Sequence, residues 1–125
     1  MAKLKTTTQN SKDNLKYRSY IFAIEVIKLV SNLPKNKIAE IIGGQLLRSG
    51  TSMGANIVEA QSGSSRRDFI QFYSHALKSA NETKFWLCIL RDSNIGDPKM
   101  IAKLLDEAIQ IANMLAKSIL TLKGK

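Results

Sequence analysis

Apolar residues recur every three or four positions along four long stretches of the chain, which is the spacing of one face of an α-helix. The pattern predicts helices over residues 13–33, 36–61, 65–92 and 98–122. No stretch alternates apolar and polar residues in the manner of a strand. The apolar stripes expected to face the core are, helix by helix, Leu15, Ile21, Ile24, Ile27 and Val30; Ile38, Ile42, Leu46, Met53 and Ile57; Phe69, Ile70, Tyr73, Leu77, Ala80, Leu87 and Leu90; and Ile101, Leu104, Leu105, Ala108, Ile111, Leu115 and Ile119.

Signals for helix starts and stops stand at the expected boundaries. Pro34 ends the first helix, because the residue before a proline is driven out of the α region. Residues 65–68 read Ser-Arg-Arg-Asp, which has the spacing of a capping box, and Asp97 followed by Pro98 is a typical helix start. The three connections are short, so consecutive helices should run antiparallel. We therefore predict one all-α domain over residues 13–122, an antiparallel up-down four-helix bundle.

The second predicted helix lacks the polar face that a helix on the outside of a monomer needs. Between residues 41 and 58 the single charged residue is Arg48. The segment also holds four glycines, which together cost about 4 kcal/mol of helix propensity relative to alanine. Close approach to another helix would offset that cost. Unless loops of the same chain cover these surfaces, we expect a homo-oligomer whose interface contains Leu47, Thr51, Val58, Phe85, Trp86 and Ile89.

The chain is basic, and its charge is unevenly distributed. Its 125 residues carry 19 Lys and Arg against 10 Asp and Glu, a formal net charge of +9. Residues 1–37 hold eight of those bases against two acids. This balance favours a polyanionic partner such as nucleic acid. The polar residues 1–12 are expected to form a flexible basic arm ahead of the bundle.

Cysteine usage and hydropathy indicate the compartment. A single Cys and a single His exclude an intrachain disulfide and a His/Cys metal cluster, and they suit a reducing cytoplasm. No segment resembles a signal peptide or is apolar for long enough to span a membrane. We expect a cytoplasmic protein that has no contact with membranes.

One motif of enzyme chemistry is present, but its context does not fit. Residues 50–54 match the G-x-S-x-G motif of serine hydrolases, and Asp68 and His75 follow in the order of that superfamily. The motif lies inside a helical pattern rather than after a strand, and Asp68 and His75 lie about 10 Å apart along a continuous helix. Phosphate loops, dinucleotide fingerprints and di-iron motifs are missing. We expect no enzymatic activity, no cofactor, no metal and no small-molecule substrate.

Several charged residues lie where a partner is needed. Arg48 and Glu59 both border the core stripe of the second helix, and Glu82 on the third helix is a candidate partner for Arg48. Arg66 and Arg67 open the third helix, where cations oppose the helix dipole. That placement hints at an anionic ligand. A salt-bridge network and a nucleic-acid contact are both open for the charged residues of these helices.

A family resemblance is carried by residues 45–60, which read QLLRSGTSMGANIVEA and resemble the signature of the 23S rRNA intervening-sequence proteins. Residues 68–70, 76–83 and 86–87 resemble the family's second signature, and the similarity extends over residues 17–120. The resemblance implies antiparallel four-helix bundles that assemble into pentamers and have no enzymatic activity. The accessory variability protein of diversity-generating retroelements is similar to this family and binds nucleic acid and a reverse transcriptase. By this resemblance, the polar core and interface residues are Arg48, Ser49, Asn56, Glu59, Glu82 and Thr83.

Two functions from different classes follow. The first is a non-enzymatic homo-oligomer, a pentamer by the resemblance, that binds nucleic acid through phosphates, with RNA favoured over DNA. No base-reading motif is present, so we expect little sequence preference. The second is an adaptor that docks a partner such as a polymerase or reverse transcriptase through the second and third helices. The expected nucleic-acid contacts are Lys12, Lys16, Arg18, Arg66, Arg67, Lys78, Lys84 and Arg91.

Overall fold

Four α-helices make up the described part of the chain, and no residue in that part belongs to a strand. The computed structural model describes residues 11–62 and 65–124, with side chains from residue 15 onward. The helices are α1 (Ser11–Ser31), α2 (Lys37–Ala60), α3 (Arg66–Asp92) and α4 (Pro98–Lys123). The prediction of an all-α fold is confirmed. Residues 1–10 of the expected arm lie outside the described residues, and residues 11 and 12 are the first two of α1.

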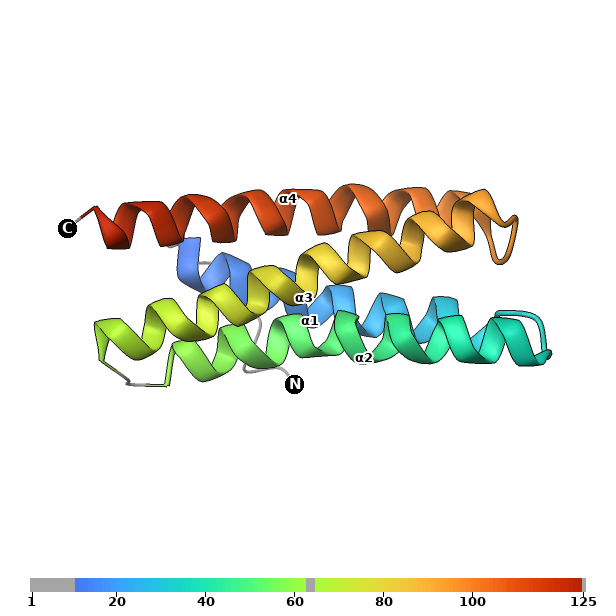
Figure 1. Ribbon diagram of the computed structural model, residues 1–125, viewed down its shortest axis with the longest axis horizontal. Helices are drawn as coiled ribbons and strands as arrows, with labels where there is room; N and C mark the ends of the chain where they lie inside the picture. The colour runs from blue at the N-terminus through green and yellow to red at the C-terminus, as the bar shows by residue number, and fades with distance from the viewer. Residues whose placement is uncertain (1–10, 63–64, 125) are drawn as a thin grey trace.

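The four helices lie lengthwise beside one another, and each contacts two neighbours (Figure 1). α1 packs against α2 and α4, and α3 packs against the same two helices. α1 and α3 therefore stand diagonally across the bundle, as do α2 and α4. The connection between α2 and α3 lies at one end of the molecule, and the other two connections lie at the opposite end (Figure 1).

The starts of α3 and α4 carry the caps that the sequence predicts. The Ser65 hydroxyl accepts a hydrogen bond from the backbone N–H of Asp68 at 3.2 Å. The Asp97 carboxylate accepts one from the backbone N–H of Lys99 at 3.1 Å, and Pro98 is the first residue of α4. These bonds satisfy N–H groups that have no partner within the first turn of a helix. Both predicted helix starts are confirmed.

A regular seven-residue pattern of buried positions builds the core. On α2 a buried stripe runs from Ala39 through Leu46 and Met53 to Ala60 in steps of three or four, with Ser49 buried beside it. This spacing keeps the stripe on one side of the helix. Ile38, predicted for this stripe, is 66% exposed because Ala39 takes the buried position in that turn. The stripes on α3 and α4 are Tyr73, Ala76, Ala80, Thr83, Leu87 and Leu90, and Ile101, Leu104, Ala108, Ile111, Ala112, Leu115 and Ile119.

The core stripe predicted for α1 is largely wrong. Ile21 and Ile27 are 37% and 48% exposed, and Phe22, Val26 and Leu29 are buried in their place. The predicted stripe advanced by three residues at each step, so it slipped backward around the helix by about 60° each time. The buried stripe alternates steps of four and three and stays aligned with its neighbours. α1 carries apolar residues on more than one face, so either stripe was compatible with its composition.

Glycines of α2 allow α1 to approach closely. A Cβ on Gly50 would lie 3.2 Å from a methyl carbon of Val26, and a Cβ on Gly54 would lie 3.3 Å from the Oγ of Ser19. Gly44 faces open space. The close helix approach that the glycines predict is therefore present, and it is made to α1 of the same chain. These glycines give no support to a contact with a second copy.

The loop between α3 and α4 packs against the end of α1. Gly96 has a φ of +97°, and a Cβ there would lie 2.8 Å from the Cδ2 of Leu33. Only a residue without a side chain meets both conditions easily. Asn94, with a φ of 57°, belongs to the residue types that tolerate this left-handed region. The loop therefore depends on these two residues to bring α4 back onto the bundle.

Candidate nucleic-acid interface

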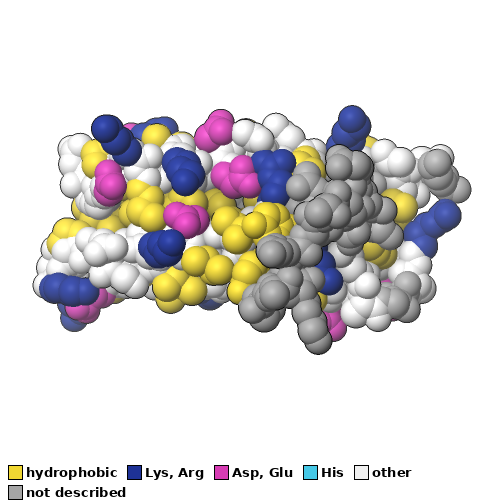
Figure 2. Space-filling model, turned by 180° about the vertical axis from the view of Figure 1, so that it is seen from behind, with side chains coloured by type: hydrophobic (Ala, Val, Ile, Leu, Met, Phe, Trp, Pro, Cys, Tyr) yellow, Lys and Arg dark blue, Asp and Glu magenta, His cyan; other side chains and the backbone are white. Residues whose placement is uncertain are grey.

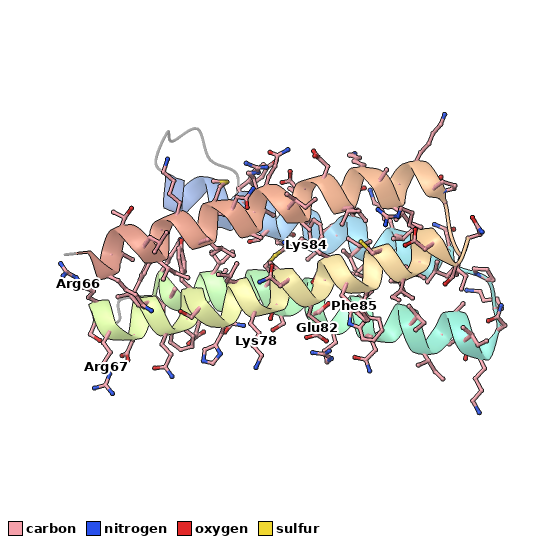
Figure 3. The ribbon with its side chains drawn as sticks, turned by 45° about the horizontal axis from the view of Figure 1, so that its top comes forward. Arg66, Arg67, Lys78, Glu82, Lys84 and Phe85 are labelled. Carbon is pink, nitrogen blue, oxygen red and sulfur yellow. The ribbon has the colours of Figure 1, made fainter. Side chains whose placement is uncertain are left out.

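The predicted nucleic-acid contacts do not gather in one patch. Arg67 and Lys78 are exposed on α3 and project from the same side of that helix, away from α4 (Figure 3). They stand about 16 Å apart along the helix axis. Arg66 lies on another side, where it lines a hollow with residues of α4. Lys84 on α3 and Lys16 on α1 are half-buried. The structure thus brings Arg67 and Lys78 to one face and spreads the other cations around the bundle.

Arg18 is committed to a contact within the bundle. Its guanidinium joins α1 to α4 through two hydrogen bonds to the Glu107 carboxylate, 2.8 Å from Nε and 2.7 Å from Nη2. Nη2 also donates to the Gln110 Oε1 at 2.8 Å. The hydrogen bonds to Glu107 raise the pKa of Arg18, although burial acts in the opposite direction. Since the side chain is only 23% exposed, Arg18 offers little free charge to a phosphate.

Arg91 is exposed but also has a carboxylate partner. Its Nε donates to the Asp92 Oδ1 at 2.8 Å. This hydrogen bond raises the pKa of Arg91 and lowers the pKa of Asp92. The side chain of Lys12 lies outside the described residues. The predicted contacts that form no ion pair with any described residue are Lys16, Arg66, Arg67, Lys78 and Lys84.

A charged cluster joins α2 to α3. Arg48 forms an ion pair with Glu82, as the sequence predicts, and its Nη2 also donates to the Gln45 Oε1 at 2.9 Å. The indole Nε1 of Trp86 donates to the Glu82 carboxylate at 3.2 Å. The hydrogen bonds from Trp86 and Arg48 lower the pKa of Glu82 from its ordinary value of 4.5. The structure therefore contains the salt-bridge network that the sequence left open for Arg48.

Small polar side chains continue this contact into the core. Ser49 and Thr83 are buried, and their hydroxyl oxygens lie 2.9 Å apart. Thr83 also donates to the carbonyl oxygen of Ser79 at 2.7 Å. The Ser79 and Ser52 hydroxyls lie 3.2 Å apart, and the Asn56 amide donates to the Ser52 carbonyl oxygen at 2.9 Å. These bonds give partners to polar groups that would otherwise be costly to bury. The two pairs that cross between the helices, Ser49 with Thr83 and Ser52 with Ser79, also hold α2 in register with α3.

The surface predicted as an oligomer interface is partly exposed. Phe85 and Val58 are 55% and 43% exposed. The Phe85 ring meets the Trp86 ring edge-on, with centroids 4.9 Å apart and an interplanar angle of 73°. Glu59 is exposed and forms no ion pair with a described residue. The remaining predicted interface residues, all half-buried, are Leu47, Thr51, Trp86 and Ile89.

A second apolar surface, which the sequence reasoning missed, lies on α1. Seen from behind, apolar side chains gather across the middle of the molecule (Figure 2). Ile21 and Ile27 are the large apolar residues that α1 exposes among its described side chains. They were overlooked because the sequence reasoning placed both in the core. The spacing of apolar residues on α1 gave no signal that could have placed them outside, because it allows two stripes.

The residue types of enzyme sites are scattered. The motif of residues 50–54 lies inside α2, as predicted, and not at a turn between strand and helix. Asp68 and His75 are both exposed on α3, and Cys88 is a free, half-buried thiol. Among the described residues, no group of three or more His, Cys, Asp or Glu side chains could hold a metal ion. No helix in this part of the chain has the length and apolar character needed to cross a membrane.

Comparison with known proteins supports the resemblance noted in the sequence. A family model described as 23S rRNA-intervening sequence protein matches residues 12–117. A crystal structure of a protein of unknown function from the S23 ribosomal protein family of Bacteroides thetaiotaomicron VPI-5482 is 35% identical and has a TM-score of 0.79. That match covers 88% of this chain and 98% of the other. A search of curated proteins found no match. The chain belongs to the 23S rRNA-intervening sequence protein family.

Proposed function

We propose that this protein is a non-enzymatic nucleic-acid-binding protein that contacts RNA phosphates as a homo-oligomer. The observation that carries the proposal is that Arg66, Arg67 and Lys78 are exposed on α3 without an ion-pair partner among the described residues. Unpaired cations attract a polyanion and release its condensed counterions on binding. The family's description refers to sequences that intervene in 23S rRNA, which makes RNA the first nucleic acid to test.

Contact with phosphates is the binding mode that this surface supports. The unpaired cations lie on more than one side of the bundle, so they suit a backbone that wraps around the protein. Phosphate contacts set the position of a protein on nucleic acid but carry no sequence information. Binding should therefore depend steeply on salt and little on base sequence.

The arrangement that we propose for the helices is antiparallel and up-down. Its support is that the colour along successive helices of Figure 1 runs in opposite directions and that the described connections are short. The subunit number that we propose, five, rests on the family resemblance. The subunit contacts that we propose include Phe85 on α3 and Val58 on α2, which are both exposed. Light scattering should then give a mass near five times 13.9 kDa. A monomeric mass would contradict the oligomer.

The test compares two double variants that remove the same amount of charge. Arg66→Gln/Arg67→Gln removes two cations at the α2–α3 end of the bundle, and Lys35→Gln/Lys37→Gln removes two at the opposite end (Figure 1). Affinity decreases with salt, and the magnitude of the slope of log affinity against log salt should decrease by about 0.7 for each phosphate of single-stranded RNA that a variant no longer neutralises. We expect the first variant to flatten this slope and the second to change it less. Equal slopes for both variants and the unmodified protein would contradict the role of α3.

A second candidate function is that of an adaptor for a protein partner. The observation that favours it is the exposed Phe85 ring beside the half-buried Trp86, because aromatic residues are enriched in protein interfaces. A pull-down after nuclease treatment separates the two functions. Recovery of one polymerase-type partner that is lost with Phe85→Ser would favour the adaptor. Recovery that disappears with the nucleic acid would favour the RNA-binding protein.

A further inference from the structure

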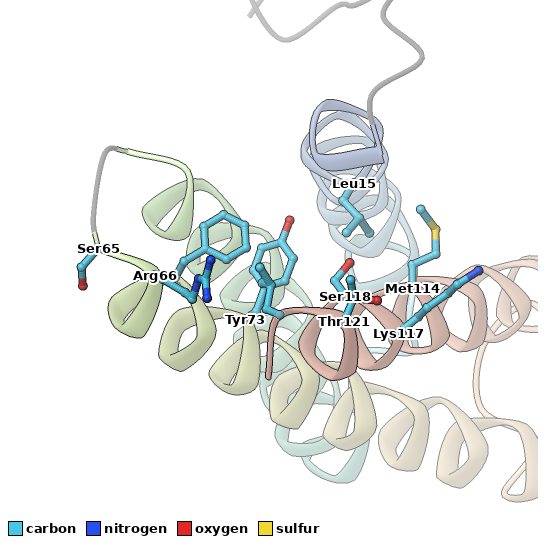
Figure 4. A pocket seen from close by; sticks show the side chains of 10 residues that line it. Leu15, Ser65, Arg66, Tyr73, Met114, Lys117, Ser118 and Thr121 are labelled. Atoms are coloured by element: carbon cyan, nitrogen blue, oxygen red, sulfur yellow. The ribbon is translucent and has the colours of Figure 1, made fainter. Parts of the chain in front are cut away.

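A hollow of about 670 Å³ opens at the end of the bundle where α3 begins and α4 ends (Figure 4). This volume lies within the range of about 300–1,000 Å³ that is typical of small-ligand sites. The predicted nucleic-acid contacts include only one of its residues. The lining residues that matter here are Arg66, Phe69 and Tyr73 from α3, and Lys117, Ser118 and Thr121 from α4.

Two aromatic rings of α3 form one wall of the hollow. The centroids of Phe69 and Tyr73 lie 4.4 Å apart, with an interplanar angle of 39°. Tyr73 is buried, and its hydroxyl accepts a hydrogen bond from the Gln61 side chain at 3.1 Å. Phe69 is half-buried. Gln61 and the core therefore hold Tyr73 in place, and Tyr73 supports a Phe69 ring that borders the hollow.

Cations and hydroxyl groups complete the lining. Arg66 and Lys117 are exposed and come from different helices. Neither forms an ion pair with a described residue. In Figure 4, Ser118 and Thr121 lie between Tyr73 and Lys117. Their hydroxyl groups can donate and accept hydrogen bonds. Apolar side chains form the rest of the lining, together with Ser65: Leu15, Met114 and Leu122. The site thus combines an aromatic wall, an apolar lining, two separated positive charges and hydroxyl groups.

The geometry points to a binding site for one unstacked nucleotide of single-stranded RNA. Its base stacks on Phe69 and reaches the hydroxyls of Ser118 and Thr121, and the flanking phosphates meet Arg66 and Lys117. Stacking on aromatic side chains tolerates any base, because each base has a π-face. The inference rests on the proposed RNA binding and adds base contact to it. Leu15, Met114 and Leu122 would also suit an uncharged apolar ligand, but the two unpaired cations at the hollow favour a ligand that carries phosphates.

The test uses two RNA probes of equal length and charge, one with all its bases and one made of abasic ribose phosphates. Fluorescence anisotropy measures the affinity of each. We expect the unmodified protein to bind the intact probe about 10-fold tighter, since stacking of one base contributes a factor of about 5–150. Phosphate contacts are the same for both probes, so the ratio of the two affinities isolates the contact with the base.

Two variants locate that contact. Ser118→Trp fills the hollow, and Ser74→Trp makes the same change at an exposed position of α3 that does not line it. Phe69→Leu removes the ring but keeps an apolar side chain, in case the larger tryptophan disturbs the fold. We expect Ser118→Trp and Phe69→Leu to bring the affinity ratio close to one. Ser74→Trp should keep the ratio of the unmodified protein.

The outcomes separate this inference from the function on which it rests. Equal affinity of the unmodified protein for both probes would overturn the base site and leave phosphate binding in place. The base site would also be overturned if Ser118→Trp and Phe69→Leu were both folded by circular dichroism and both kept the affinity ratio of the unmodified protein. Failure to bind either probe at low salt would overturn the proposed RNA binding, and the base site with it.

Discussion

The carboxylate of Glu82 on α3 forms an ion pair with the guanidinium of Arg48 on α2. The same carboxylate accepts the indole N–H of Trp86 at 3.2 Å, and Trp86 in turn meets the edge of the exposed Phe85 ring. One acidic side chain therefore connects the packing of two helices to the aromatic surface that we assign to subunit contact. Substitution of Glu82 should therefore change both the free energy of unfolding and the association of subunits.

Acid should weaken the contribution of Glu82 to the fold. The hydrogen bonds from Trp86 and Arg48 lower the pKa of Glu82 in the folded protein. The stabilisation is therefore present above the pKa of the unfolded carboxyl and is lost as the pH falls through the lower, folded pKa. We expect Glu82→Gln to reduce the free energy of unfolding by up to about 1 kcal/mol near neutral pH. Urea unfolding should show this difference shrinking below pH 4.5, the ordinary pKa of the group. A difference that stays constant into strong acid would contradict the assignment.

Two glycines of α2 should respond differently to the same substitution. Alanine stabilises an exposed helix position by about 0.5–1 kcal/mol relative to glycine, and Gly44 has nothing within 4 Å of an added Cβ. Gly44→Ala should therefore raise the melting temperature. Gly50→Ala would place its Cβ 3.2 Å from Val26, a β-branched residue that cannot easily turn away. Thermal unfolding should find Gly50→Ala the less stable of the two variants. The reverse order would show that α1 and α2 are not closely packed at this point.

The buried hydroxyls of Ser49 and Thr83 should stabilise the fold as a pair. Thr83→Val removes one partner and leaves the Ser49 hydroxyl with a weaker bond to the Leu46 carbonyl, 3.4 Å away. We expect each of Thr83→Val and Ser49→Ala to cost about 1 kcal/mol. The double variant should cost less than the sum of the two, because each single change already breaks the shared hydrogen bond. Additive losses in urea unfolding would mean that the two hydroxyls do not interact.

Substitutions of Arg18 and Lys78 should distinguish a cation that stabilises the fold from one that binds RNA. The variants Arg18→Gln and Lys78→Gln each remove one positive charge. Arg18 is bonded to Glu107 and Gln110, so Arg18→Gln should lower the free energy of unfolding by about 1 kcal/mol and change RNA affinity little. Lys78 forms no ion pair with a described residue, so Lys78→Gln should weaken RNA binding and leave stability nearly unchanged. The opposite assignment of effects would place the RNA on the α1–α4 side.

Much of the fold follows from local signals. The capping residues Ser65 and Asp97 mark the starts of two helices, and the apolar spacing of α4 identifies its buried face. α1 was more difficult, because apolar residues cover more than one of its faces and spacing alone allows two stripes. Packing against α2 and α4 decides between them, and this packing depends on residues far away in the sequence. The glycines of α2 show the same limit, since they predicted a close approach without identifying its partner.

Less of the candidate site than of the fold could be predicted from the sequence. The partnership of Arg48 with Glu82 could be expected, because both side chains border neighbouring core stripes. The pairing of Arg18 with Glu107 was missed, because the two residues lie 89 positions apart and no motif joins them. The hollow at the end of the bundle could not be predicted either, because it forms only when the helices of the chain pack together. Arg66 and Lys117 line the same hollow only because the end of α4 lies beside the start of α3.

Salt-dependent RNA binding is the central claim, and one titration tests it most directly. Nuclease-treated protein is added to a labelled rRNA hairpin, an unrelated RNA and a DNA of the same length, and anisotropy is followed at about 50 mM and about 200 mM salt. We predict binding to all three at the lower salt, little dependence on sequence, and a fall in affinity of about 10³-fold or more at the higher salt if six or more phosphates are contacted. If the protein bound none of the three probes at the lower salt, the claim would be contradicted.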